Sequence, residues 1–216
     1  MIRLDSVEKE YKKPYKKVLD KVSFEIQNQE MVAVMGKSGA GKSTLLSLLG
    51  CLEKLDGGTY WYDDVEVSKL RKREMHQFRK QHISYIFQNF ELIPQYTVYE
   101  NVEVPLLARD ITNRKKIIHK ALEEVGILEH RRKKINKLSG GEQQRCAIAR
   151  ALVADTDIIL ADEPTGALDE KTADEIMDIL TGLNQKGKSV IIVTHDKDIA
   201  NKCHRIIRMK DGKIVE

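Results

Sequence analysis

A glycine-rich segment in the first quarter of the chain carries the strongest chemical signal. Residues 36–44 read Gly-Lys-Ser-Gly-Ala-Gly-Lys-Ser-Thr and fit the pattern G-x-x-x-x-G-K-S/T completely. Small residues let successive backbone N–H groups point at phosphate oxygens, and the start of a helix adds partial positive charge. Lys42 supplies a full charge for the β- and γ-phosphates, and Ser43 offers a hydroxyl to Mg²⁺. The segment predicts a nucleoside-triphosphate site built from Gly36, Ser38, Gly39, Ala40, Gly41, Lys42, Ser43 and Thr44.

Two adjacent carboxylates follow an apolar run far downstream. Residues 158–161 read Ile-Ile-Leu-Ala, and Asp162 and Glu163 come directly after them. Ligands gather at the carboxyl ends of parallel strands, where Asp162 can hold Mg²⁺ through water. Neighbouring strand residues point to opposite sides, so the two carboxylates are expected to differ in role. Glu163 is the candidate that orients or deprotonates the water attacking the γ-phosphate.

The apolar pattern predicts the elements that must position these residues. Alternating or buried runs indicate strands over 2–7, 18–26, 31–35, 59–62, 83–87, 157–161 and 189–194, and a hairpin over 205–216. Helical patterns run from about Lys42 to a C-cap at Gly50, over 69–82 and over 170–185. Buried strands that alternate with helices indicate a mainly parallel sheet with helices on its faces.

The stretch 89–152 has a mainly helical sequence pattern, unlike the strand-rich segments on either side. Thr97 and Glu100 form a capping-box pattern, and Gly126 follows an amphipathic run as a helix end. We therefore expect this stretch to be an inserted helical lobe. Four residues at or just before its start are apolar enough to form either a docking groove or part of the lobe's own core: Phe87, Phe90, Leu92 and Tyr96.

Composition excludes several classes of protein. The chain has 216 residues, 41% hydrophobic and 32% charged, which rules out disorder and collagen-like repeats. The odd set of cysteines, Cys51, Cys146 and Cys203, has no Cys-x-x-Cys spacing and fits a reducing cytosol. No apolar run reaches the 18 or so residues of a membrane span. The first residues carry no signal core, so we expect a soluble chain.

Charge is unevenly distributed along the chain. The total is +4, but residues 69–137 carry +8 and the remainder −4. The basic stretch either faces anionic lipid or an acidic partner, or is a solvated helical face. The excess is too mild to predict nucleic-acid binding, which needs sharper clustering and a reading motif.

A third motif lies between the first two. Residues 138–145 read Leu-Ser-Gly-Gly-Glu-Gln-Gln-Arg. With this ordered set of motifs, the chain resembles the ATP-binding-cassette (ABC) ATPases from about residue 2 to its end. The resemblance implies a single ABC ATPase domain over 1–216: a P-loop NTPase core over 1–88 and 153–216, with a mainly parallel sheet and an N-terminal antiparallel β subdomain. The inserted α-helical lobe is then 89–152.

The resemblance also assigns roles to individual residues. Gln88 matches the Q-loop, which approaches Mg²⁺ and hinges the lobe, and His195 matches the switch histidine at the γ-phosphate. Asp169 matches the D-loop, which couples two sites across a dimer, although Gly166 departs from the family's usual Ser. An aromatic side chain stacks on adenine, with Tyr11 the first candidate and Tyr15 the reserve. The signature motif of an opposing copy, here Ser139, Gly140, Gly141 and Glu142, closes on the γ-phosphate; Glu142 stands where the short consensus has Gln.

The function implied by the resemblance is that of a transporter ATPase. Two copies bind ATP and Mg²⁺, hydrolyse ATP, and drive a separate membrane permease through the lobe and Q-loop, from the cytoplasmic face of the membrane. Segments 48–53, 57–60, 101–106 and 161–169 are similar to the branch with macrolide exporters, lipoprotein-release ATPases and bacitracin-type efflux pumps. The alternative is an ATP-driven transmitter that controls an envelope or cell-division partner without transport. A soluble ABC ATPase of translation or repair is disfavoured by the short chain.

Overall fold

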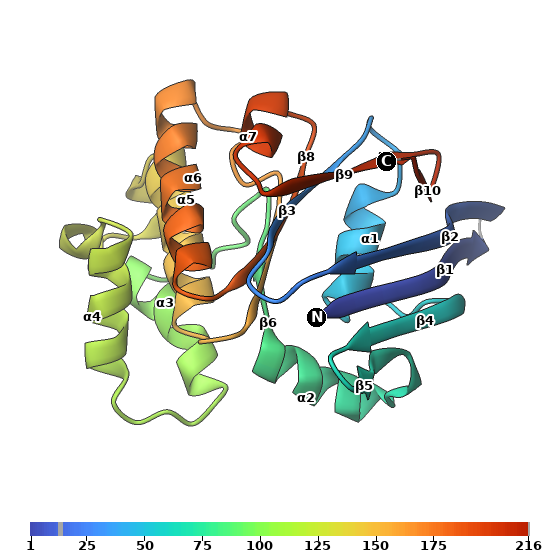
Figure 1. Ribbon diagram of the computed structural model, residues 1–216. Coiled ribbons are helices and arrows are strands. Elements are labelled where there is room, and N and C mark those ends of the chain that lie inside the picture. Colours follow the sequence, from blue (N-terminus) through green and yellow to red (C-terminus); the bar gives the residue numbers. More distant parts are fainter. Residues whose placement is uncertain (13–14, 216) are drawn as a thin grey trace.

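Two β-sheets form the frame of the molecule (Figure 1). A computed structural model describes residues 1–12 and 15–215. In these residues one sheet has the strand order β2-β1-β4-β5, and the other has the order β10-β9-β3-β8-β7-β6. The predicted α/β fold is confirmed, with its mainly parallel sheet, its antiparallel sheet in the N-terminal part and its additional helices.

The smaller sheet is antiparallel. It contains β1 (Ile2–Lys12), β2 (Tyr15–Ile26), β4 (Gly57–Tyr62) and β5 (Val65–Glu66). β1 extends five residues beyond its predicted end because its pairing with β2 continues to Lys12↔Tyr15. The far ends of β1 and β2 are mostly exposed, so they carry no apolar alternation that could reveal them as strands.

The larger sheet is parallel except at one edge. It contains β3 (Met31–Met35), β6 (Ile83–Ile86), β7 (Ile158–Asp162), β8 (Ser189–Thr194), β9 (Arg205–Lys210) and β10 (Lys213–Ile214). Only β10 runs antiparallel to its neighbour, β9. The predicted strand 157–161 is shifted by one residue, so that Asp162 ends β7. The predicted hairpin is present, although its last residue, Glu216, lies outside the described residues.

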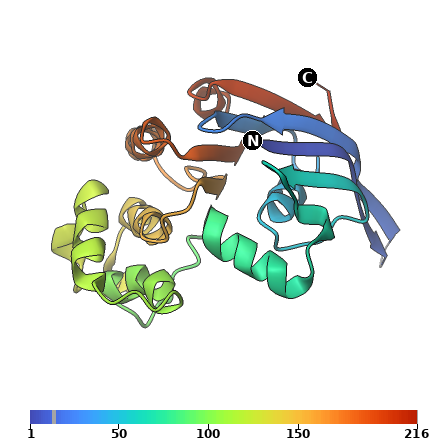
Figure 2. The ribbon, with the colours of Figure 1, turned by 60° about the horizontal axis from the view of Figure 1, so that its bottom comes forward.

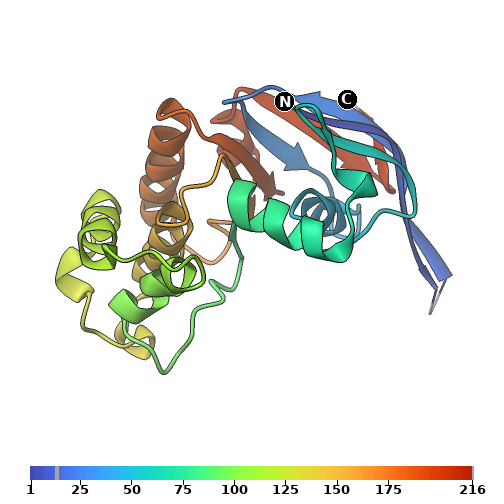
Figure 3. The same ribbon diagram turned by 90° about the horizontal axis from the view of Figure 1, so that it is seen from below.

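Helices cover both faces of the larger sheet (Figure 1). The α-helices are α1 (Lys42–Leu49), α2 (Lys72–His82), α3 (Val98–Leu107), α4 (Arg114–Glu124), α5 (Gly140–Leu152), α6 (Glu170–Gln185) and α7 (Lys197–Asn201). Single 3₁₀ turns lie at Val67–Lys69, Leu128–His130 and Ile135–Lys137. Helices α3, α4 and α5 gather on the side away from the antiparallel sheet (Figure 2). Seen from below, α2 lies in front of α1, between that sheet and these helices (Figure 3).

Strand alternation divides the interior into two main apolar clusters. On β7, Ile158 and Leu160 pack with α1 and the antiparallel sheet, whereas Ile159 and Ala161 pack with α3 to α6. Because successive strand residues point to opposite faces, one short strand contributes to both clusters. A parallel sheet covered on both faces reads as a continuous apolar run, which is why β3 and β8 were identifiable from sequence.

The ends of several helices match their sequence signals. Thr97 Oγ1 accepts from Glu100 N at 3.2 Å, and Thr97 N donates to Glu100 Oε2 at 2.7 Å, which confirms the capping box of α3. Gly126 has a φ of 72° just after α4. The predicted helix 69–82 begins only at Lys72, because Glu74 caps the backbone N–H of Arg71.

Gly50 caps α1 for a reason other than the one predicted. Its φ is −76°, and the left-handed residue is Cys51, with a φ of 53°. A Cβ on Gly50 would lie 2.9 Å from Tyr85 Cε2 and 3.2 Å from Leu160 Cδ1. Close packing of α1 against the larger sheet, rather than turn geometry, therefore requires glycine there.

The cysteines and the helices bear on the chain's environment. Cys51, Cys146 and Cys203 are free thiols, and Cys51 and Cys146 are buried. Over residues 1–12 and 15–215, none of the helices combines the length and the apolar character needed to cross a membrane.

The close contact at Gly50 generates a stability prediction. Gly50→Ala should lower the free energy of unfolding by about 1–3 kcal/mol, because the added methyl overpacks α1 against Tyr85 and Leu160. Gly182→Ala is the matched control: it lies inside α6 with no atom within 4 Å of the added Cβ, and should raise that free energy by about 0.5–1 kcal/mol. Urea titration of the three proteins measures both changes; equal stabilities would contradict the packing argument.

Candidate active site

The glycine-rich loop connects β3 to α1 and encloses a lysine. Lys42 Nζ donates to Gly36 O at 2.8 Å and to Lys37 O at 3.3 Å, and only 9% of the residue is exposed. Gly41, the N-cap of α1, has a φ of 100°, and a Cβ there would lie 2.8 Å from Val18 O. No side chain caps this helix. Its first N–H groups are therefore available to an anion, beside a fixed positive charge.

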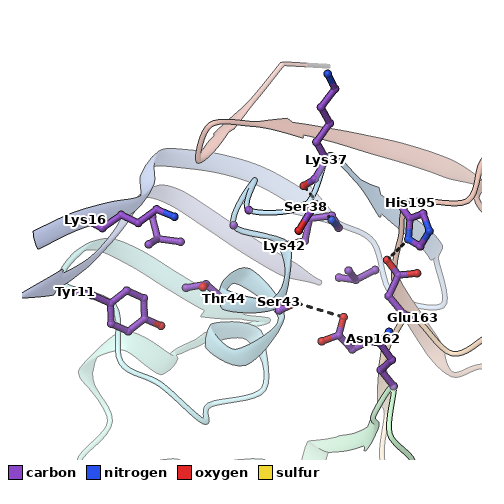
Figure 4. Close-up of a pocket in the computed structure, with 15 residues that line it drawn as sticks. Tyr11, Lys16, Lys37, Ser38, Lys42, Ser43, Thr44, Asp162, Glu163 and His195 are labelled. Atoms are coloured by element: carbon purple, nitrogen blue, oxygen red, sulfur yellow. Dashed lines mark hydrogen bonds and ion pairs between the residues drawn. The ribbon is translucent and has the colours of Figure 1, made fainter. Parts of the chain in front are cut away.

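A cavity of about 810 Å³ opens in front of this loop (Figure 4). Residues from the antiparallel sheet, the loop and the carboxyl ends of β6, β7 and β8 line it: Tyr11, Lys16, Val18, Lys37, Ser38, Gly39, Gly41, Lys42, Ser43, Thr44, Gln88, Asp162, Glu163, Val193 and His195. The structure thus brings together residues that lie up to 184 positions apart in the chain. Gly36 and Ala40 belong to the same loop but are not among the lining residues.

Oxygen donors meet on one side of the cavity. Ser43 Oγ lies 3.5 Å from Asp162 Oδ1, and the side chain of Gln88 lines the same cavity. Burial raises the pKa of Asp162, and the Ser43 hydroxyl opposes that rise. A hydroxyl, a carboxylate and an amide are hard oxygen ligands of the type that Mg²⁺ prefers, so the donor set fits this ion.

Glu163 has a strained backbone, and its N–H and both carboxylate oxygens have hydrogen-bond partners. Its φ is 45°, and its N–H donates to Val193 O at 2.9 Å. Its Oε1 lies 2.7 Å from His195 Nδ1, and its Oε2 accepts from Thr194 Oγ1 at 3.2 Å. A left-handed backbone at a non-glycine residue costs free energy and is common where function requires it.

That backbone corrects one step of the sequence argument. Strand alternation was expected to separate Asp162 from Glu163, but β7 ends at Asp162 and Glu163 has already left the extended conformation. The two carboxylates still have different partners, Ser43 for one and His195 with Thr194 for the other. The left-handed turn, not the alternation of a strand, produces the difference.

The structure separates the two tyrosine candidates. Tyr11 lines the cavity, and its hydroxyl donates to the Glu53 carboxylate at 2.8 Å. Partial burial and the Glu53 carboxylate raise the pKa of Tyr11. Tyr15 is 68% exposed, bonds Glu10 and is not part of the lining. The pairing Tyr11↔Lys16 also brings Lys16 to the cavity, which the sequence argument missed within a run of lysines.

The Leu-Ser-Gly-Gly segment lies at a separate depression of about 290 Å³. The depression shares no lining residue with the larger cavity. It is lined by Ser139, Gly140, Gly141, Glu142, Arg145, Ala167, Leu168, Asp169, Thr172 and Glu175. Asp169 caps α6 by accepting from Thr172 N at 3.0 Å and Thr172 Oγ1 at 2.7 Å. These bonds to Thr172 lower the pKa of Asp169. The predicted in-trans residues therefore lie together, away from this chain's own phosphate loop.

The predicted groove residues divide into different environments. Phe87 lines an apolar groove of about 340 Å³ between α2 and β6 on one side and α3 and α5 on the other. Leu92 instead packs against the buried cluster around α3 to α6, and Tyr96 is exposed outside the groove. Phe90 O accepts from Arg150 Nη2 at 2.7 Å. Phe87 thus lines a groove and Leu92 belongs to the core of the lobe, so the four residues do not share one environment.

A glycine loop around a buried lysine, with carboxylates at the ends of the neighbouring parallel strands, defines a nucleoside-triphosphate hydrolase of the P-loop class. The family model for ABC transporters matches residues 19–166, and the chain belongs to this family. It is the ATP-binding, ATP-hydrolysing subunit of an ABC transporter and is related to macrolide exporters.

Relatives of known sequence or structure match the whole chain. An uncharacterized ABC transporter ATP-binding protein of Bacillus subtilis, YknY, is 41% identical over 219 residues, 100% of this chain and 95% of that protein. The macrolide export ATP-binding/permease protein MacB 1/2 of Paracoccus denitrificans is 43% identical, but the chain covers only 33% of it. The dimeric structure of the bacterial ABC transporter cassette MJ0796 matches with a TM-score of 0.92 and 41% identity, covering 100% of this chain and 97% of that chain.

The ionised side chain of Asp162 is expected to lower the stability of the folded chain while it serves to bind Mg²⁺. Burial raises its folded-state pKa, so its ionised form is less favourable in the folded than in the unfolded chain. Without nucleotide, the contribution of Asp162 to the stability of the folded chain should increase as pH falls through that pKa. Asp162→Asn should mimic this and raise the free energy of unfolding by about 0.5–2 kcal/mol.

The same substitution should remove the extra stabilisation that ATP provides when Mg²⁺ is present. Unfolding measured with and without Mg²⁺ and ATP checks both parts. Asp178 is an exposed carboxylate on α6. Asp178→Asn is the control and should change the free energy of unfolding by less than about 0.5 kcal/mol. A destabilised Asp162→Asn protein would overturn the electrostatic argument.

Proposed function

We propose that this chain works as a homodimer in which each ATP is enclosed by the phosphate loop of one copy and the Leu-Ser-Gly-Gly segment of the other. One observation carries the proposal: the two anion-binding helix starts, those of α1 and α5, line separate cavities within one chain. A second copy would bring the start of α5 to the phosphate that the first copy holds. The similarity to a dimeric cassette supports this arrangement.

Most residues of the larger cavity have a role in the proposal. Backbone N–H groups of 36–44 and Lys42 bind the phosphates, and Tyr11 offers a flat surface for adenine. Ser43, Asp162 and Gln88 would hold Mg²⁺, which neutralises phosphate charge when bound. Glu163 orients and deprotonates the attacking water.

His195 completes the catalytic group. Its Nδ1 lies 2.7 Å from Glu163 Oε1, and its side chain is 71% exposed on the cavity side. It fixes the Glu163 carboxylate and reaches the γ-phosphate. Asp169, in the depression of the opposing motif, couples the two sites across the dimer.

We further propose that the apolar groove receives a short cytoplasmic helix of a membrane permease. Leu52, Tyr85, Phe87, Pro105 and Ala108 give it apolar walls, and it lies where the core meets the helices α3 and α5. An apolar groove of this type suits the apolar face of an amphipathic helix. The chain would then act at the inner face of the membrane in export or extraction of a macrolide, antimicrobial peptide or lipoprotein, as the relation to macrolide export proteins suggests.

The first test of the proposed function is ATP-dependent dimerisation. Glu163→Gln should keep ATP binding, lower turnover about 100-fold or more, and trap a dimer in Mg²⁺ and ATP. Sedimentation velocity measures the dimer, and phosphate release measures turnover. Normal phosphate release from this variant would falsify the assignment of Glu163 as the base.

A second substitution tests the opposing motif. A Cβ on Gly140 lies no closer than 3.5 Å to its nearest neighbour, Leu168 Cδ2, so Gly140→Ala fits within one chain. It places a methyl group in the depression that the phosphate would enter. Added to Glu163→Gln, it should abolish the trapped dimer; an unchanged dimer would contradict the in-trans arrangement.

The groove yields its own prediction. Leu52 is 47% exposed and lines the groove, whereas Val65 is 43% exposed on β5 and lies outside it. In a pull-down of the tagged Glu163→Gln chain from solubilised native membranes, Leu52→Asp should reduce recovery of the membrane partner about fivefold or more. Val65→Asp is the matched control and should leave recovery unchanged. Equal losses from both variants would contradict docking in the groove.

A further inference from the structure

A histidine outside the described motifs contacts the start of α5. His130 ends the 3₁₀ turn Leu128–His130, and its Nε2 lies 2.7 Å from Glu142 Oε1. The side chains of His130 and Glu142 are 19% and 28% exposed. Half-buried pairs at this distance are shielded better from solvent than ordinary surface ion pairs.

Glu142 uses its other oxygen to cap the same helix. Ser139 N donates to Glu142 Oε2 at 2.7 Å, and Ser139 Oγ accepts from Glu142 N at 3.3 Å. The backbone N–H of Ser139 is the main reason that the pKa of Glu142 is lowered, with a smaller contribution from His130. The carboxylate is therefore a charged bridge between the helix start and His130.

This charge stands where the anion-binding role requires positive potential. The N–H groups of Gly140 and Gly141 begin α5 and have no acceptor within the helix. A γ-phosphate approaching them would meet the Glu142 carboxylate, which lines the same depression. A Gln, as in the family's short consensus, could cap without this charge. Here the negative charge needs a counter-ion that also holds the carboxylate away from the free N–H groups.

We propose that His130 is a positioning residue for the Leu-Ser-Gly-Gly segment: through Glu142 it fixes the first turn of α5, and its protonation strengthens closure of the dimer on ATP. The inference rests on the proposed in-trans function. Imidazoles titrate near neutral pH, so the effect falls within the pH range of a cell. Closure should be favoured at pH values where His130 carries a proton.

Other charged groups lie near the pair of His130 and Glu142. Glu129, on the same 3₁₀ turn, lies 3.7 Å from His130 Nε2, and Lys133 acts on Glu142 from the following loop. Arg145, one turn along α5, is paired with Glu175 on α6 at 2.7 Å. Among these side chains, His130 is the imidazole.

The experiment compares two histidine variants in the Glu163→Gln chain. His130→Gln keeps a hydrogen-bond donor but cannot be protonated, and so resembles the neutral imidazole. His119→Gln is the matched control, because His119 is also a lobe histidine but packs edge-on against Tyr99, with ring centroids 6.4 Å apart. Any effect of pH on ATP or on other residues is common to both chains, so it cancels in the ratio of their dimer dissociation constants.

The expected result is a pH-dependent ratio of dimer dissociation constants in Mg²⁺ and ATP. At pH 6.0, His130→Gln should weaken the dimer about fivefold relative to His119→Gln, and at pH 8.0 the two should agree within about twofold. A ratio that does not change between these pH values overturns the inference.

A second background separates a positioning effect from a general loss of structure. In chains that also carry Glu142→Gln, His130→Gln should cause no additional weakening at pH 6.0, because its target has been removed. An undiminished effect would show that His130 does not act through Glu142, and would overturn the inference.

The last measurement does not depend on dimerisation. In the nucleotide-free chain, the NMR amide signals of Gly140 and Gly141 should shift along the titration curve of the His130 ring. Amide signals that stay constant through that titration overturn the inference. If the Glu163→Gln chain formed no dimer at any pH, the proposed function would fail, while these signals would still decide whether His130 controls the helix start.

Discussion

The absence of a side-chain cap on α1 is the constraint on which the rest of the site depends. The N-cap residues of α3, α5 and α6 are Thr, Ser and Asp, whose side chains accept a backbone N–H, whereas the N-cap of α1, Gly41, has no side chain to do so. Helices α2 and α4 also lack this bond, but their starts do not line the phosphate cavity. Burial of Leu45, Leu46 and Leu49 keeps α1 in place without this stabilisation. The first N–H groups of α1 therefore have no side-chain partner, and a phosphate can supply what a side chain does not.

Contacts across the molecule connect the last turn of α5 to the segment that leaves the phosphate cavity. Arg150, on the last turn of α5, donates to the carbonyls of Phe90 and Glu91, in the segment that follows Gln88. Both of these residues have left-handed backbones, with φ values of 61° and 47°. The helix that begins with the Leu-Ser-Gly-Gly segment is thus bonded directly to the chain leaving the phosphate cavity. A displacement of α5 would be transmitted to that segment through an arginine rather than through loose packing.

Local signals predicted much of this protein, and features set by tertiary pairing were not predictable. The glycine loop, the carboxylates at the end of β7 and the capping boxes are local patterns with a direct physical interpretation. The choice between Tyr11 and Tyr15 depended on how β1 pairs with β2, which the sequence leaves open within a run of lysines. The left-handed turn at Glu163 and the contact of His130 with Glu142 arise from neighbours far along the chain. No periodicity in the sequence reveals them.

The half-buried carboxylate of Asp162 has a consequence for the lifetime of the protein in a cell. A charge that the folded chain holds at a cost makes the nucleotide-free form the less durable one. A ligand that binds only the folded form, at 100 times its dissociation constant, adds about 2.7 kcal/mol of stability. Proteases act on transiently opened chains, so abundant nucleotide lowers the rate of degradation. The lifetime of the subunit is therefore coupled to the occupation of its phosphate site.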